Sequence, residues 1–151
     1  MKARSLLFSL LAVPLLAGCD IEPAAYLIDG GDHSLTVERR KPYFWSDGWE
    51  LDLVVARFPD CQRRHPLKKA GEKVFVYLFR VQPGVFILKQ GKRWYVADTA
   101  DCRMQQYDEE PPAPGELLGA FRVKNGVFGF VPAEDVSVEA RDKARKSGEE
   151  Q

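Results

Sequence analysis

The sequence predicts a mainly β domain, either an antiparallel sheet or a small open β-barrel, with an α+β fold as the alternative. Two observations favour this fold class. The apolar segments beyond residue 25 are short and rich in the β-branched and aromatic residues that fit a pleated, half-buried surface. Turn signals that contain glycine separate these segments, as expected for strands joined by hairpins.

The N-terminal part of the domain predicts three strands. Residues 26–32 suggest a short apolar strand that ends in a glycine-rich turn. Residues 34–45 alternate apolar and polar side chains until Pro42 interrupts the pattern, which suits an edge strand. The turn at 46–48 leads into 49–58, where alternation gives way to a continuous apolar run. The second and third strands are expected to form an antiparallel hairpin.

A surface loop and a three-strand meander are predicted next. Residues 59–73 are rich in proline, cysteine, glycine and basic residues, and suggest a loop that Cys61 ties down. Beyond it, three segments dense in β-branched and aromatic residues predict the meander. These segments are 73–81, 84–89 and 93–98. The turn at 98–102 could bring Cys102 back toward the loop at Cys61.

The C-terminal part predicts a connector, a hairpin and a charged end. Residues 108–116 are acidic and proline-rich, and form either a stiff connector or a polyproline segment for a recognition module. Asn125-Gly126 between apolar runs is the strongest short-range hairpin signal in the chain. Residues 137–151 predict a short charged helix that frays, or a disordered tail. Residues 126–136, GVFGFVPAEDV, resemble the final hairpin of Src-homology-type small barrels, including bacterial extracellular versions, which implies a small antiparallel β fold.

The first twenty residues contain the parts of an export signal. Lys2 and Arg4 give a basic start, residues 6–16 are apolar, and small residues precede Cys19. The apolar segment is too short for a membrane-spanning helix, which needs about 20 apolar residues. Three roles are then open for Cys19: a packed thiol, half of a disulfide, or an attachment point for lipid.

The stretch Leu16-Ala17-Gly18-Cys19 resembles the lipobox of bacterial lipoproteins. The resemblance implies a diacylglyceryl thioether on Cys19, cleavage before this cysteine, and acylation of the new amine by a chain such as palmitate. Because each buried methylene contributes about 0.8 kcal/mol, two or three chains make a lasting anchor. Aspartate at position 20 resembles an inner-membrane retention signal, so the periplasmic side of the inner membrane is favoured over the outer membrane. The alternative is an ordinary secretory signal in which Cys19 is incidental.

The predicted organisation is a cleaved signal peptide (1–18), a lipidated tether (19–25), one β-rich domain (26–136) and a charged tail (137–151). The signal carries two of the 22 basic residues and none of the 22 acidic ones, so the mature chain has a formal net charge of −2. Such a near-neutral chain offers no general field for nucleic acid. The expected partners are the lipid bilayer, through Cys19, and an envelope protein or polymer.

Once Cys19 is acylated, Cys61 and Cys102 remain as an even pair. In an oxidising compartment such a pair predicts a disulfide. The bridge would close a loop of about 42 residues, which the chain-entropy model values at about 4 kcal/mol. The alternative is a reactive thiol or a metal site with His65 and His33. Zinc prefers four well-spaced ligands, and the chain has only two histidines and no Cys-x-x-Cys pair, so neither a metal nor a cofactor is expected.

Two groups of residues are candidate binding surfaces. A basic cluster could face anionic headgroups or an acidic envelope polymer, unless it is only a solvated loop. An aromatic group could contact a protein partner or a sugar ring, unless it packs in the core. The basic residues are Arg63, Arg64, Lys68 and Lys69, and the aromatic residues are Tyr43, Phe44, Trp45 and Trp49.

The sequence contains no recognisable catalytic motif. It has no nucleophile elbow, phosphate-binding glycine loop or histidine-glutamate zinc motif. We therefore expect a membrane-anchored envelope lipoprotein that acts as a non-catalytic binding or accessory module. An unrecognised envelope hydrolase or thiol-redox enzyme is the first alternative, and a structural or stress-related lipoprotein is the second.

Overall fold

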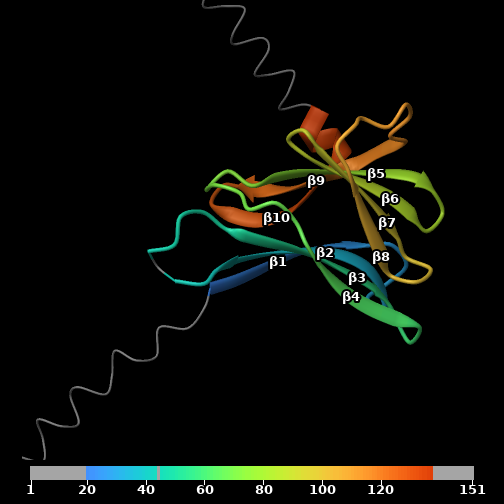
Figure 1. Ribbon diagram of the computed structural model, residues 1–151, viewed down its shortest axis with the longest axis horizontal. Helices are drawn as coiled ribbons and strands as arrows, with labels where there is room; N and C mark the ends of the chain where they lie inside the picture. The colour runs from blue at the N-terminus through green and yellow to red at the C-terminus, as the bar shows by residue number, and fades with distance from the viewer. Residues whose placement is uncertain (1–19, 44, 138–151) are drawn as a thin grey trace, which may run out of the picture.

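Two antiparallel β-sheets face each other across one hydrophobic core (Figure 1). The structure is a computed structural model, and it describes residues 20–43 and 45–137. The mainly β class is therefore as predicted. The described strands form a four-stranded and a six-stranded sheet, and neither sheet closes on itself.

The four-stranded sheet runs in the order β1-β2-β3-β4 and the six-stranded sheet in the order β10-β9-β5-β6-β7-β8. The first sheet consists of β1 (Asp20–Leu27), β2 (His33–Lys41), β3 (Glu50–Arg57) and β4 (Cys61–Pro66). The second consists of β5 (Phe75–Gln82), β6 (Val85–Gln90), β7 (Arg93–Asp98), β8 (Arg103–Tyr107), β9 (Glu116–Lys124) and β10 (Val127–Pro132).

The core lies between the sheets because alternate side chains of each strand point inward. The four-stranded sheet contributes Leu35, Val37, Leu53 and Val55, all fully buried. The six-stranded sheet contributes Val76, Leu78, Phe86, Leu88, Tyr95 and Phe121. These residues belong to one continuous cluster, so the burial of one sheet depends on the presence of the other.

The hairpin of β2 and β3 is confirmed, but β2 is an internal strand and not the predicted edge. The first strand begins at Asp20, not at Tyr26, and pairs with β2 from Ser34 to Lys41. Residues 20–25, predicted as a tether, therefore lie in the sheet. Ala24 is buried against the core, so the face of β1 that carries Ala24 points toward the other sheet. Pro23 fits there because β1 is an edge strand, where one missing N–H disturbs no ladder.

The predicted loop at 59–73 is wrong over its first half, where the chain forms β4. The prediction failed because the charged residues were interpreted as a sign of a loop, although an edge strand with one solvated side also tolerates charged residues. Cys61 and His65 project toward the other sheet, whereas the remaining residues of β4 are exposed. Beyond β4, Leu67 donates its backbone N–H to Leu51, so the chain still follows β3 after the strand ends.

The meander of β5, β6 and β7 and the hairpin of β9 and β10 are confirmed. Asn125 and Gly126 both have positive φ, 53° and 81°, as a type I′ turn requires. Strand β8 was not predicted. It pairs with β7 at the far edge, so the acidic proline-rich connector carries the chain past three strands to β9, which pairs with β5.

Residues 133–137 form a short helical turn after β10. Val136 in this turn is buried against Ala120 and Val131 on the outer side of the six-stranded sheet. Most of the predicted charged tail (138–151) lies outside the described residues, as do Phe44 and residues 1–19 with the predicted signal and Cys19. Within the described part, no helix is long and apolar enough to span a bilayer.

Candidate functional site

The disulfide of Cys61 and Cys102 joins the two sheets at one end of the sandwich. Its S–S distance is 2.03 Å, and it links β4 to the turn between β7 and β8. This pairing was predicted. Both cysteines are bonded to each other, so neither is a free thiol in this structure.

Both histidines of the chain bridge the sheets near this disulfide. His65 Nε2 lies 2.8 Å from the carbonyl oxygen of Cys102, and His33 Nε2 lies 2.9 Å from Oγ1 of Thr99. The carbonyl only accepts, so His65 donates from Nε2. The hydroxyl of Thr99 donates to the carbonyl of Gly84 at 3.1 Å, so His33 also donates from Nε2. The histidines therefore act here as structural links.

The predicted aromatic group divides into an exposed pair and a buried ring. Tyr43 and Trp45 are 59% and 66% exposed, and their rings stack at 5.0 Å with an angle of 6°. They lie on the loop between β2 and β3. Ser46 holds this turn, because its backbone N–H donates to the carbonyl of Tyr43 and its Oγ accepts from the Tyr43 N–H.

Trp49 does not belong to this surface, because it is buried in the core at 6% exposure. Its Nε1 donates to Glu72 at 3.2 Å, and Arg39 stacks on its ring at 4.1 Å. Lys41 also binds Glu72, at 3.1 Å. The hydrogen bond from Trp49 has the largest effect in lowering the pKa of Glu72, and the hydrogen bond from Lys41 lowers it further. Trp49 is therefore a core residue whose ring is buried and whose one polar group, Nε1–H, has a hydrogen-bond partner.

The basic cluster is also divided, because Arg63 and Arg64 are neighbours on β4 and point to opposite faces. Arg64 lies on the outer face and pairs with Glu38 and with Asp52. The hydrogen bond that Arg64 donates to Glu38 raises the pKa of Arg64, and the hydrogen bond that it donates to Asp52 adds to the effect. These carboxylates neutralise Arg64 and remove it from the set of charges that a partner could use.

Of the two lysines of the cluster, Lys69 has a carboxylate partner and Lys68 has none within the described residues. Lys69 pairs with Glu50 at 3.3 Å, and Arg40 pairs with the same carboxylate at 2.9 Å. The hydrogen bond from Arg40 has the largest effect in lowering the pKa of Glu50, and the hydrogen bond from Lys69 lowers it further. Arg63 and Lys68 are exposed, and within the described residues neither has a carboxylate partner. These two cations therefore remain as the basic part of the candidate surface.

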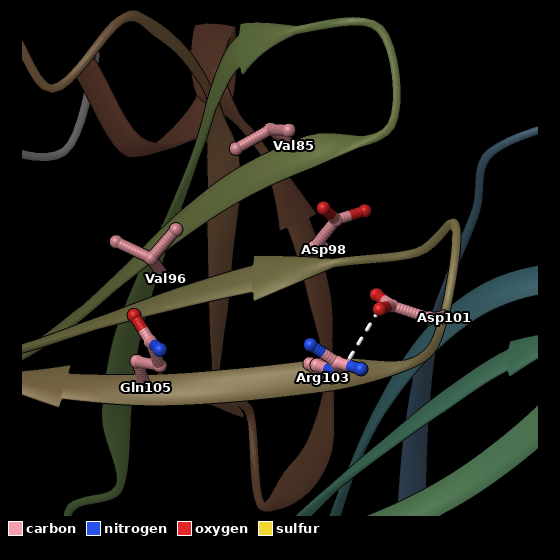
Figure 2. A pocket seen from close by; sticks show the side chains of 6 residues that line it. All are labelled: Val85, Val96, Asp98, Asp101, Arg103 and Gln105. Atoms are coloured by element: carbon pink, nitrogen blue, oxygen red, sulfur yellow. Dashed lines mark ion pairs between the residues drawn. The ribbon is translucent and has the colours of Figure 1, made fainter.

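A pocket of about 230 Å³ opens on the outer side of β6, β7 and β8 (Figure 2). Its lining residues are Val85, Val96, Asp98, Asp101, Arg103 and Gln105. Figure 2 shows Asp101 facing Arg103, and their side chains form an ion pair at 2.9 Å. Asp98 accepts a hydrogen bond from the backbone N–H of Ala100 at 2.8 Å, which closes the turn. Both carboxylates thus have structural partners. Sequence reasoning did not find this pocket, because its residues converge only when three strands are in register.

Metal binding finds no support in the described part of the chain, where no group of three or more histidine, cysteine or acidic side chains could hold an ion. Comparison with protein-family models, with curated proteins and with solved structures finds no match for the chain. Function is therefore inferred from the residues of this chain alone.

Proposed function

We propose that this protein is an envelope lipoprotein, anchored by acyl chains on Cys19, whose β-sandwich acts as a non-catalytic binding or accessory module at the membrane surface. The observation that carries the anchor is the lipobox-like Leu16-Ala17-Gly18-Cys19 after a basic and then apolar segment. Strand β1 begins at Asp20, the next residue. An acylated Cys19 would therefore hold the folded domain directly against the bilayer, without a spacer.

The disulfide supports an exported location on the periplasmic side of the membrane. Disulfides persist in oxidising compartments and are rare in the cytosol. The two cysteines that remain after Cys19 form this bridge. Asp20 favours the inner membrane over the outer one by its resemblance to a retention signal.

A binding role is supported by the way the potentially reactive side chains are used. The two histidines and the disulfide join the sheets, and the pocket carboxylates hold a turn and an arginine. In contrast, Arg63 and Lys68 are exposed, and in the described structure no carboxylate neutralises them. They lie on or beside the edge strand β4, where an acidic protein or polymer of the envelope could dock.

The anchor is tested on protein isolated from membranes of a host that processes lipoproteins. Intact-mass measurement should show a mature chain that starts at Cys19 and carries two or three acyl chains. Cys19→Ala should lose the acyl mass and the membrane fractionation. The double variant Cys61→Ala/Cys102→Ala should keep both, because it removes the other cysteines only. An unmodified Cys19 in the wild-type protein overturns the proposed anchor.

The binding role is tested by in-cell crosslinking from a photoreactive residue at Gln62 on β4. We expect a discrete acidic partner, and its capture should fall in Arg63→Glu/Lys68→Glu and at raised salt, which screens exposed charges. The single variants Arg63→Glu and Lys68→Glu are each compared with Lys92→Glu as the matched control, because Lys92→Glu makes the same change of charge on the exposed β6–β7 turn of the other sheet. If the purified protein instead turns over an envelope substrate, and one polar substitution stops turnover without unfolding it, the hydrolase alternative replaces this role.

A further inference from the structure

We propose that the aromatic loop, defined as residues 42–48 with Tyr43 and Trp45, rests in the headgroup region of the same bilayer that holds Cys19. This inference rests on the proposed lipid anchor and adds a second contact with the membrane. The acyl chains would retain the protein, and the aromatic loop would fix the orientation of the sandwich relative to the bilayer.

The register of the first sheet brings the aromatic loop next to the anchor residue. Asp20, the first residue after Cys19, lies opposite Lys41, the last residue of β2 before the loop. Partner Cα atoms in an antiparallel pair are about 5 Å apart, and consecutive Cα atoms are about 3.8 Å apart. The base of the aromatic loop at Lys41 therefore lies about 5 Å from Asp20, the residue that follows Cys19 in the chain. Figure 1 shows the loop and the start of β1 at the same end of the sandwich.

The side chains exposed at this end have the chemistry of the membrane interface. Trp and Tyr are enriched at headgroup depth, because an apolar ring carries one polar group that can stay hydrated. Tyr43 and Trp45 are among the most exposed large hydrophobic residues of the described chain. The apolar side chain of Ile21 on β1 is also 52% exposed and lies two residues from the anchor.

Hydrogen bonds between Tyr43 and Ser46 and the stack of Tyr43 on Trp45 hold the exposed rings in place, which lowers the entropic cost of placing them in the bilayer. The backbone N–H of Ser46 donates to the carbonyl of Tyr43 at 3.0 Å, and the N–H of Tyr43 donates to Oγ of Ser46 at 3.2 Å. The two rings stack in parallel planes. They would therefore enter the interface as one unit.

The two cations at the base of the loop are already neutralised by the protein. Lys41 pairs with Glu72, and Arg40 pairs with Glu50. Attraction to anionic headgroups is therefore a minor contribution, and apolar and interfacial burial of the rings is the main one. It follows that the depth of the loop should change little with salt or with the fraction of anionic lipid.

The three tryptophans of the chain make this contact measurable, because only one is exposed. Trp49 is 6% and Trp94 is 4% exposed, against 66% for Trp45. The acylated full-length product is reconstituted in phosphatidylcholine vesicles, with and without phosphatidylglycerol, using lipids brominated near the headgroup or at mid-chain. We expect quenching and a blue shift of the Trp45 emission, strongest with the shallow bromines and equal in both lipid mixtures. Trp45→Phe should remove the quenched component and keep the buried background.

An emission from Trp45 that stays water-like and unquenched on the vesicle overturns the proposal. If that signal then shifts on addition of a soluble envelope polymer or protein, the aromatic loop serves such a partner instead. Quenching that disappears with high salt, or that requires phosphatidylglycerol, also overturns it, because it indicates electrostatic attraction by the basic residues.

Failure of the anchor and failure of the loop contact give different results. If intact mass shows that cells leave Cys19 unmodified, the proposed anchor fails. The chain from residue 19 onward is then coupled through the Cys19 thiol to a maleimide lipid, since Cys61 and Cys102 are bonded to each other. Quenching of Trp45 in this arm supports the interfacial affinity of the loop, and its absence overturns that affinity.

Discussion

The guanidinium of Arg39 lies 4.1 Å from the centroid of the Trp49 ring, at the end of the sandwich where β1 begins. Arg39 lies on the inward face of β2, at a position where the alternating pattern predicts an apolar side chain, and its side chain is only 6% exposed. Glu22 on β1 holds Nη2 at 2.6 Å and Nε at 3.0 Å, and Phe128 lies on the opposite sheet at 5.1 Å. A planar, stacked and paired arginine thus closes this end of the core.

Removing Glu22 should cost more stability than removing the charge of Arg39. Glu22→Ala leaves a buried guanidinium without its carboxylate, and we expect a loss of about 2 kcal/mol, below the full cost of a buried pair because Glu22 is 33% exposed. Arg39→Met keeps apolar volume over Trp49 and should cost less than about 1 kcal/mol. Urea unfolding followed by circular dichroism gives both values.

Glu116→Ala is the control for this pair of variants. Glu116 binds Arg80 in an exposed ion pair, so its loss should cost less than about 0.5 kcal/mol. A greater loss in Arg39→Met than in Glu22→Ala would contradict the role given to the Glu22 carboxylate.

Reduction of the disulfide should destabilise the sandwich strongly. Cys61 and Cys102 are 41 residues apart, and the chain-entropy model assigns about 4 kcal/mol to a loop of that size. Cys61→Ala, Cys102→Ala and the double variant should all lose a similar amount, because each removes the same constraint. The measurement is the urea midpoint with and without reductant. Reductant should shift the wild type and leave the double variant unchanged; a wild type insensitive to it would exclude this role.

Two glycines of the last hairpin should respond differently to alanine. Gly126 has a φ of +81° but open space around its missing Cβ, so Gly126→Ala should cost about 1 kcal/mol through backbone strain alone. A Cβ on Gly119 would lie 2.2 Å from the carbonyl oxygen of Val131 and 2.6 Å from Phe130. Gly119→Ala should therefore cost about 3 kcal/mol or prevent folding. Thermal unfolding compares them, and equal effects would argue against this close contact of β9 and β10.

The ion pair of Glu72 should make part of the stability depend on pH. The folded-state pKa of Glu72 is lowered, chiefly by the hydrogen bond from Trp49 and next by Lys41. Its contribution is therefore complete above the unfolded pKa and is lost as pH falls through the folded pKa. Wild type should exceed Glu72→Gln in stability near pH 7, and the difference should vanish in acid. Urea midpoints across the acid range test this, and a constant difference would count against the carboxylate charge.

Local signals predicted the strands with strong alternation and clear turns. The meander ends at glycine turns, and Asn125-Gly126 supplies the two positive φ angles of its hairpin. The cysteine pair followed from counting, once Cys19 was assigned to lipid. Strand β4 was missed because its charged residues match a loop, and only pairing with β3 makes it a strand.

The aromatic residues show why the candidate site needed the tertiary structure. Trp45 and Trp49 are four residues apart in similar surroundings, yet one is exposed and the other lies in the core. Trp49 is buried because Arg39 and Glu72, from other segments, surround it. Nothing in the residues next to either ring specifies these neighbours.

The sequence by itself determined the β class, most strands, the hairpin turns and the cysteine pairing, and it predicts the lipid anchor. These features follow from alternation, turn chemistry and short motifs, which act over a few residues. The tertiary structure decided which strands share a sheet, which basic residues are neutralised, and that the aromatic loop lies beside Asp20. Those relationships depend on register between distant segments, and register is set by how well whole faces pack across the core.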